Sequence, residues 1–342
     1  MIGCQTDIQL TMALEQISGR RRIGFQIERD HVTLRNQLRR IVSMVTRRIP
    51  RVRGLGRVVL LLDRFLTQVN DPRSYEAVAA VNDGSRLLLD LRSREQKFAF
   101  YYGVLEPDFI VATKQNFQQG TFYDIGASIG LYTVAFGRIC RDRGCLVRSI
   151  EPVPQNLERL RAQLLLNGLS QSVVEIDEVA LGDTEGVAEM YLTDADIPGN
   201  AKVADYGNVQ VRLTTLDLLW REHGCESIGF IKIDTEGWDA KIILGGREAI
   251  SSCRPNMLVE FNRERMQIYN IPIEPCWKFL VDDLGYRAYR ITSAGGLVPV
   301  TSPDMAQYLL FLAGSPAIAR SRSALASVPT SIANGDGVAH AD

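Results

Sequence analysis

The sequence predicts an α/β fold built on a parallel sheet. One observation is the order of patterns over residues 121–136, TFYDIGASIGLYTVAF, which give a short strand, a glycine turn and a helix start. A second is the alternation of strand and helix patterns from residue 121 onward, as a parallel sheet requires. A third is an acid, Glu151, directly after the next strand, at 146–150. Residues 185–192 and 209–213 interrupt the alternation and predict a hairpin.

The glycine turn has residue types suited to each of its parts. Phe122 and Ile125 are aromatic or β-branched and favour a buried strand. We expect Gly126 to let the backbone turn sharply and approach a ligand, and Gly130 to let the helix pack on the strand. The N-terminus of that helix presents free N–H groups to an anionic group.

Asp124 indicates which nucleotide the turn binds. A dinucleotide-binding fingerprint has glycine at this position, two residues before Gly126, and an acid there repels a pyrophosphate. The carboxylate can instead accept hydrogen bonds from the ammonium of an amino-acid moiety. S-adenosylmethionine has an ammonium, a carboxylate and a ribose but no phosphate, and is the expected cofactor. The alternative is a tight turn capped by an aspartate.

Glu151 is the expected ribose ligand. It lies 21 residues after Gly130, at the end of a strand, where α/β nucleotide-binding folds place an acid that holds two ribose hydroxyls. The alternative is a carboxylate that caps the helix beginning near Pro154.

A second informative stretch is FIKIDTEGWD, residues 230–239. Strand alternation places Lys232 and Asp234 on one face. A lysine in an apolar strand needs an acidic partner, because an unpaired buried ammonium is costly. The candidates are Asp124 and Glu260, which end two other predicted strands, and we predict a structural pair between Lys232 and Glu260.

Asp234 and Glu236 follow the strand at the edge where open α/β sheets bind ligands. The alternative for Glu236 is that it only favours the first turn of the next helix.

Several motifs together resemble the FkbM family of S-adenosylmethionine-dependent methyltransferases. They are DIGASIG at 124–130, EPVP at 151–154, Leu216 with Asp217, KIDTEG at 232–237, and Arg254 and Pro255 followed by Glu260. Their order and spacing match over roughly residues 121–262, and Ser128 stands where the family more often has asparagine. The resemblance implies a class I (Rossmann-like) fold, a seven-stranded, mostly parallel sheet whose last strand is antiparallel. It also implies methyl transfer to a hydroxyl group, often of a sugar in a glycolipid, polysaccharide or antibiotic.

The predicted site follows from these motifs. Methyl transfer to a sugar hydroxyl is helped by a base. Histidine is scarce, so the candidates are the carboxylates Asp234, Glu236 and Glu260. The spacing of these acids is not diagnostic of a metal, and none is predicted. Ala180 is expected near the adenine and Asp234 near the methionine end. The full set of predicted cofactor-binding residues is Asp124, Gly126, Ser128, Gly130, Glu151, Ala180 and Asp234.

Two other functions compete with this one. A nicotinamide-dependent oxidoreductase needs the glycine-rich pyrophosphate turn that Asp124 interrupts. A non-catalytic ligand-binding protein has no need of acids at the ends of several strands.

Composition restricts the partners and the location. The chain has 342 residues and a net charge of −1, so no nucleic-acid partner is predicted. No apolar run approaches the ~20 residues of a membrane-spanning helix, and the N-terminus lacks a signal pattern. Six cysteines are dispersed without a C-x-x-C pair, which is typical of a cytoplasmic protein. The methyl acceptor is expected to be a small molecule or a glycan.

The chain divides into four predicted regions. Residues 1–56 form a basic, amphipathic helical extension, 57–120 a segment packed on the core, 121–314 the methyltransferase domain and 315–342 a disordered tail. Between Arg20 and Arg53 there are 11 arginines. One interpretation is that an arginine face contacts an anionic membrane or glycolipid; the other is a helix docked on its own domain with that face in solvent. The face comprises Arg35, Arg39, Arg40, Arg47 and Arg48.

Overall fold

The structure is a computed structural model, in which residues 34–48, 55–66, 75–103, 106–191, 202–203, 209–303 and 308–314 are described. The predicted tail at 315–342 and the first 33 residues of the N-terminal extension lie outside these ranges.

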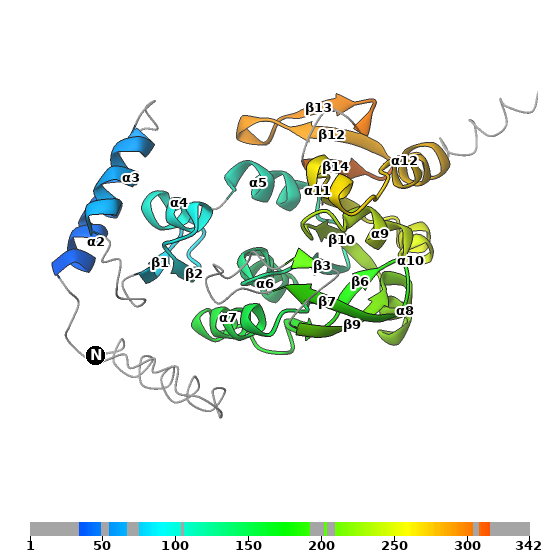
Figure 1. The fold of residues 1–342 in the computed structure, drawn as a ribbon, viewed down its shortest axis with the longest axis horizontal. Coiled ribbons are helices and arrows are strands. Elements are labelled where there is room, and N and C mark those ends of the chain that lie inside the picture. Colours follow the sequence, from blue (N-terminus) through cyan, green and yellow to red (C-terminus); the bar gives the residue numbers. More distant parts are fainter. Residues whose placement is uncertain are drawn as a thin grey trace, which may run out of the picture.

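The central element is an eight-stranded sheet with the order β13-β12-β14-β11-β10-β3-β4-β5 (Figure 1). Five neighbouring strands are parallel: β5 (Val174–Asp177), β4 (Val147–Ile150), β3 (Thr121–Ile125), β10 (Ile228–Ile233) and β11 (Asn256–Glu260). The other three are β14 (Tyr308–Leu312), β12 (Arg287–Ile291) and β13 (Leu297–Val300). The last strand, β14, is antiparallel to both neighbours, β11 and β12.

This arrangement confirms the predicted class I fold, with one strand more than the predicted seven. The extra strand is β13, which forms an antiparallel hairpin with β12 at the sheet edge. Among the other seven strands of this sheet in the described chain, six run in the same direction and only β14 runs opposite to them.

Both faces of the sheet are buried under helices, because strand side chains alternate between two apolar layers. On one face Phe122 stacks on Phe136 with ring centroids 4.0 Å apart and on Phe230 at 5.6 Å. On the other, Ile231 and Ile233 pack into a second cluster. The first layer includes residues of α6 (Leu131–Arg143) and α7 (Pro154–Leu166). The second includes residues of α8 (Leu216–Glu222), α9 (Asp239–Leu244), α10 (Arg247–Cys253), α11 (Arg263–Ile268) and α12 (Glu274–Trp277), followed by a π-helix (Lys278–Asp283).

A smaller sheet has the order β6-β9-β7-β8 and lies beside the large one (Figure 1). Its strands are β6 (Ala180–Gly182), β7 (Gly186–Tyr191), β8 (Lys202–Val203) and β9 (Val209–Thr215). β7 and β9 pair antiparallel, which confirms the predicted hairpin.

The segment before the large sheet is tied to it through polar side chains. It contains α3 (Leu55–Leu66), the hairpin of β1 (Glu76–Ala80) and β2 (Arg86–Asp90), α4 (Arg94–Tyr102) and α5 (Pro107–Asn116). Gln163 of α7 accepts a hydrogen bond from the N–H of Leu88 and donates one to its carbonyl. This pairing satisfies both backbone groups of Leu88 and joins β2 to the domain.

The N-terminal helix α2 (Leu34–Thr46) turns some of its arginines inward. Arg39 is 1% exposed, and its Nε lies 3.2 Å from Oδ1 of Asp63 on α3. Arg47 donates hydrogen bonds to the carbonyls of Ala80 and Phe100, each 2.6 Å long. The prediction that the arginines face solvent together is therefore wrong for these two, whereas Arg40 and Arg48 are exposed.

The physical reason is a buried acid. Asp63 is fully buried, and a buried carboxylate is stable only when it is paired and hydrogen-bonded. Besides Arg39, it contacts Lys97 Nζ at 2.9 Å and accepts a 2.6 Å hydrogen bond from Tyr101. This network joins α2, α3 and α4. Helix α2 is therefore docked on the rest of the chain, but Arg39 and Arg47 point inward instead of facing solvent. Across the described ranges, none of the helices has the length and apolarity needed to cross a membrane.

Candidate active site

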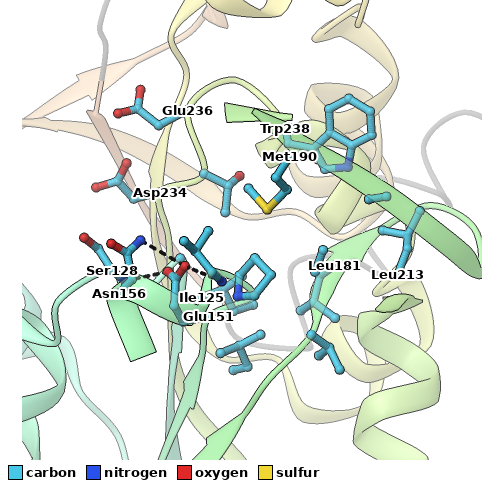
Figure 2. Close-up of a pocket in the computed structure, with 18 residues that line it drawn as sticks. Ile125, Ser128, Glu151, Asn156, Leu181, Met190, Leu213, Asp234, Glu236 and Trp238 are labelled. Atoms are coloured by element: carbon cyan, nitrogen blue, oxygen red, sulfur yellow. Dashed lines mark hydrogen bonds between the residues drawn. The ribbon is translucent and has the colours of Figure 1, made fainter. Parts of the chain in front are cut away.

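An open pocket of about 690 Å³ lies at the carboxyl ends of β3, β4 and β10, against the small sheet. Figure 2 shows acidic side chains on one side of it and the apolar Leu181 and Leu213 on the other. The structure brings together six residues predicted for the site: Gly126, Ser128, Glu151, Ala180, Asp234 and Glu236. The rest of the lining is Ile125, Ile150, Pro152, Val153, Asn156, Val179, Leu181, Ala188, Met190, Leu213, Thr235 and Trp238.

Glu151 is held by three donors. One carboxylate oxygen accepts from the N–H of Ser128 at 2.8 Å, and the other from the N–H of Val153 at 3.0 Å and the amide of Asn156 at 3.1 Å. Burial raises the pKa of Glu151, although these hydrogen bonds oppose the shift. A carboxylate has about four lone-pair sites, so these three donors leave room for a hydroxyl group.

The capping alternative for Glu151 also describes part of this geometry, because Val153 directly precedes α7. The same carboxylate nevertheless lines the pocket, so it can serve the helix and a ligand together.

The glycine turn brings two strand ends into contact. Gly126 has φ of +71°, and a Cβ there would lie 2.0 Å from the carbonyl oxygen of Asp234. No side chain fits at that separation, so glycine is required where the ends of β3 and β10 meet. Ser128 also has positive φ, +54°, a conformation in which asparagine is more frequent. That conformation accompanies the hydrogen bond from its N–H to Glu151.

Asp124 does not line the pocket, contrary to expectation. It is fully buried behind the turn, where it accepts a 2.6 Å hydrogen bond from Thr133 and lies 3.4 Å from Lys232 Nζ. Lys232 in turn donates a 3.0 Å hydrogen bond to the carbonyl of Gly126. The ammonium that Asp124 meets is therefore a lysine of the same chain, and through it Asp124 supports the glycine turn.

The predicted structural pair of Lys232 with Glu260 is therefore wrong: the acid that Lys232 pairs with is Asp124, the other candidate, and its Nζ also lies 3.7 Å from Asp234. Burial alone would lower the pKa of Lys232, but the neighbouring carboxylates raise it above its usual value. Glu260 is buried at the end of β11, opposite Tyr308 of β14, and is not among the residues lining the pocket.

Gly130 also lies outside the lining. It has φ of +86°, and a Cβ there would lie 2.3 Å from Leu160 of α7. Its role is helix–helix contact between α6 and α7, rather than the predicted helix–strand contact.

Asp234 is the acid best placed to meet a ligand. Its side chain is 27% exposed and accepts a 3.1 Å hydrogen bond from the hydroxyl of Tyr308. Burial, followed by the charge of Asp234, raises the pKa of Tyr308, so this hydroxyl stays a donor. Glu236, whose φ is +61°, forms an ion pair with Arg265 of α11.

Asp239 holds the loop between β10 and α9. It is fully buried and accepts from the N–H and hydroxyl of Thr235 at 2.9 and 3.1 Å and from the N–H of Gly237 at 3.1 Å. Burial and the charge of Asp234 raise the pKa of Asp239 from 3.8 to about 7.

Asp239 should therefore make stability depend on pH. The folded chain retains a proton that the unfolded chain has released, so this stabilising contribution is complete below pH 3.8 and is lost as the pH rises through about 7. With Asp239→Asn, urea unfolding should show a smaller decrease in stability over this window than the wild-type protein. If the free energy of unfolding changed with pH by the same amount in both proteins, the raised pKa would not belong to Asp239.

The sequence prediction missed several site residues. Asn156 and Trp238 flank predicted motifs, and their positions just after EPVP and DTEG were the available signal. Met190, Leu213 and Tyr308 reach the site through strand pairings that a linear pattern does not specify.

Comparison with known proteins identifies one domain of the chain. Residues 124–288 match the methyltransferase FkbM domain. No curated protein matches this chain.

Among solved structures, a methyltransferase FkbM from Methylobacillus flagellatus aligns with a TM-score of 0.37 and 17% identity, over 81% of this chain and 58% of that one. This chain thus spans less than two thirds of that protein. An O-methyltransferase from Bacillus cereus, in complex with SAH, aligns with a TM-score of 0.37 and 13% identity, over 81% of this chain and 97% of that one. An rRNA methylase from Streptococcus thermophilus aligns with a TM-score of 0.34 and 10% identity, over 60% of this chain and 92% of that one. These likenesses are weak, and the fold assignment rests on the strand order above.

The methyl donor of such a methyltransferase domain is S-adenosylmethionine, and the pocket residues fit it. A buried carboxylate with remaining acceptor capacity suits a ribose, and Gly126 leaves no side chain between the two strand ends. Apolar walls from β6, β7 and β9 suit a flat base. Residues 124–288 of this chain are a methyltransferase FkbM domain.

Proposed function

We propose that the protein transfers a methyl group to a hydroxyl of a sugar, in a glycolipid, a polysaccharide or another natural product. The observation that carries the proposal is the placement of Asp234. Its carboxylate is partly exposed on the acidic side of the pocket and is oriented by the buried Lys232 and the half-buried Tyr308. A carboxylate in this position can accept the proton that a hydroxyl loses when its oxygen is methylated.

The cofactor side of the pocket has a distinct role for each wall. Glu151 would accept a hydrogen bond from a ribose hydroxyl, while Ala180 and Leu181 would lie against the adenine. Gly126 and Ser128 would border the cofactor through the backbone of the glycine turn. When bound, the cofactor supplies an electrophilic methyl group on a positively charged sulfur. The main contribution of the chain is to align the acceptor oxygen with that methyl carbon.

The three predicted carboxylates differ in suitability as the base. Asp234 and Glu236 both line the pocket, but Glu236 is engaged by Arg265, whereas Asp234 is oriented by Tyr308. Glu260 lies outside the lining. We therefore assign proton acceptance to Asp234 and orientation of Asp234 to Tyr308.

The test is methyl transfer from radiolabelled S-adenosylmethionine to lipid and glycan extracts. We expect labelled products whose methyl group survives mild base, as an ether does and an ester does not. A base-labile label would identify a carboxylate acceptor and overturn the assignment to hydroxyls. Parallel titration with NAD should show no binding, which would exclude the nicotinamide-dependent alternative.

Removal of the Glu151 carboxylate should weaken cofactor binding. Glu151→Ala is expected to reduce the affinity for S-adenosylmethionine by roughly 1–3 kcal/mol, the usual loss for a hydrogen bond to a charged group. Isothermal titration calorimetry measures this directly. Glu178→Ala is the matched control, because Glu178 is exposed and pairs with Arg161 away from the pocket. Equal affinities for both variants would refute the ribose assignment.

We also place the enzyme in the cytoplasm. The five cysteines within the described residues are free, as expected where thiols remain reduced.

A further inference from the structure

Helices α2 and α3 lie at one end of the molecule (Figure 1) and carry exposed apolar side chains. Eight large apolar side chains on them are between 40% and 57% exposed: Leu38, Ile41, Met44, Val45, Val58, Leu60, Leu61 and Leu62. We call this set the outer face. A gathering of exposed large apolar side chains on two neighbouring helices marks a candidate interaction site.

The exposure follows from how the helices are anchored. Two polar residues of α2 point inward: Ser43 donates a 2.8 Å hydrogen bond to the carbonyl of Phe100, and Thr46 donates one of 2.6 Å to that of Tyr101. Arg39 meets the buried Asp63 in the same layer. Rotating either helix to bury its apolar side would strand these polar groups, so the inward network keeps the outer face exposed.

The charges beside the outer face indicate what covers it. Arg40 and Arg48 are exposed next to the apolar residues of α2. Helix α2 contains no acid, and the only acid of α3 is the fully buried Asp63. The described surface here is therefore apolar and positive.

These charges favour a lipid surface over a second copy. A two-fold pairing of identical faces would bring like charges together. An anionic bilayer complements the arginines and accepts the apolar side chains at the same time.

The lengths of the helices indicate how they would lie. With 13 and 12 residues, each is about 20 Å long, well short of the ~30 Å hydrocarbon core of a bilayer. They are suited to lie along the interface, with the apolar residues at the headgroup boundary.

We propose that the outer face of α2 and α3 binds the surface of an anionic membrane. This contact is mediated by apolar side chains with flanking arginines, rather than by a continuous arginine face. It is separate from the catalytic pocket and would hold the enzyme beside lipid-linked molecules.

The test is sedimentation of the full chain with vesicles of phosphatidylcholine plus phosphatidylglycerol, and with vesicles of phosphatidylcholine alone. The wild-type protein should bind the anionic vesicles more strongly. The double variant Ile41→Gln with Leu61→Gln should bind the anionic vesicles at least roughly tenfold more weakly, because it removes two inserting side chains. Arg48→Gln should weaken binding by about fivefold.

Leu165→Gln is the matched control, a change at a 40% exposed leucine on the surface of α7, and it should bind as the wild type does. Calorimetry with S-adenosylmethionine should give the same affinity for all variants, so the outcome is independent of the methyl-transfer proposal. No binding by the wild type, or equal binding by the double variant, would overturn the proposal. So would gel filtration showing a wild-type dimer that the double variant converts to a monomer, since a second copy would then cover the face.

Discussion

Replacing Lys232 with methionine is expected to destabilise the fold by ~3–5 kcal/mol. Lys232 is 6% exposed in its side chain, and its ammonium lies 3.4 Å from a fully buried Asp124. Without it, Asp124 would be a buried charge with no cation beside it, and the carbonyl of Gly126 would lose its donor. Urea unfolding followed by circular dichroism measures the loss, which is a large share of the roughly 5–15 kcal/mol by which an ordinary protein is stable.

A surface lysine provides the matched control. Lys241 lies 3.5 Å from Asp183 with its side chain 31% exposed, and Lys241→Met should cost less than about 1 kcal/mol. Adding Asp124→Leu to Lys232→Met should recover part of the loss, because the stranded charge is then removed. A loss for Lys232→Met no larger than that for Lys241→Met would show that the buried pair is not structural.

Asp234→Asn is expected to lower turnover by ~10²-fold or more while the protein remains folded. The change nearly preserves the shape of the side chain and removes its capacity to accept a proton. Initial rates of methyl transfer should fall while the melting temperature stays near that of the wild type. Glu236→Gln should have a smaller effect, since Glu236 is engaged by Arg265.

The turnover measurement needs a second readout, because Asp234 is also a predicted cofactor-binding residue. Loss of a base lowers kcat with little change in cofactor affinity, whereas loss of a cofactor contact lowers affinity. Tyr308→Phe removes the donor to Asp234 and should lower kcat less than Asp234→Asn does. Wild-type kcat in both Asp234→Asn and Glu236→Gln would leave alignment of the acceptor as the chief source of catalysis.

Local chemistry was sufficient to predict much of the fold. The strand, glycine turn and helix at 121–136 form as β3 and α6, and the apolar run at 228–233 forms a fully buried strand, β10. Glu151 reaches the pocket because it directly follows a strand, and in a parallel sheet strand ends share one edge.

Side-chain partners were harder to predict, because they depend on strand order and on burial. Lys232 has Asp124 on one neighbouring strand and Leu258 on the other, and only the register shows which side chain reaches its ammonium. The inward turn of Arg39 depends on Asp63, an acid in an otherwise apolar stretch that the sequence pattern did not mark as buried. Tyr308 contacts Asp234 across 74 residues of chain.

The position of β14 has a consequence for the order in which the protein folds during synthesis. The last strand lies between β11 and β12, so the hairpin of β12 and β13 has no edge to pair with until residues 308–312 have left the ribosome. The same strand supplies Tyr308, whose hydroxyl orients Asp234. A nascent chain can therefore assemble the glycine turn and the parallel strands while its candidate base still lacks one of the two groups that hold it. On the proposed role of Asp234, its full support would be in place only after β14 has paired with β11.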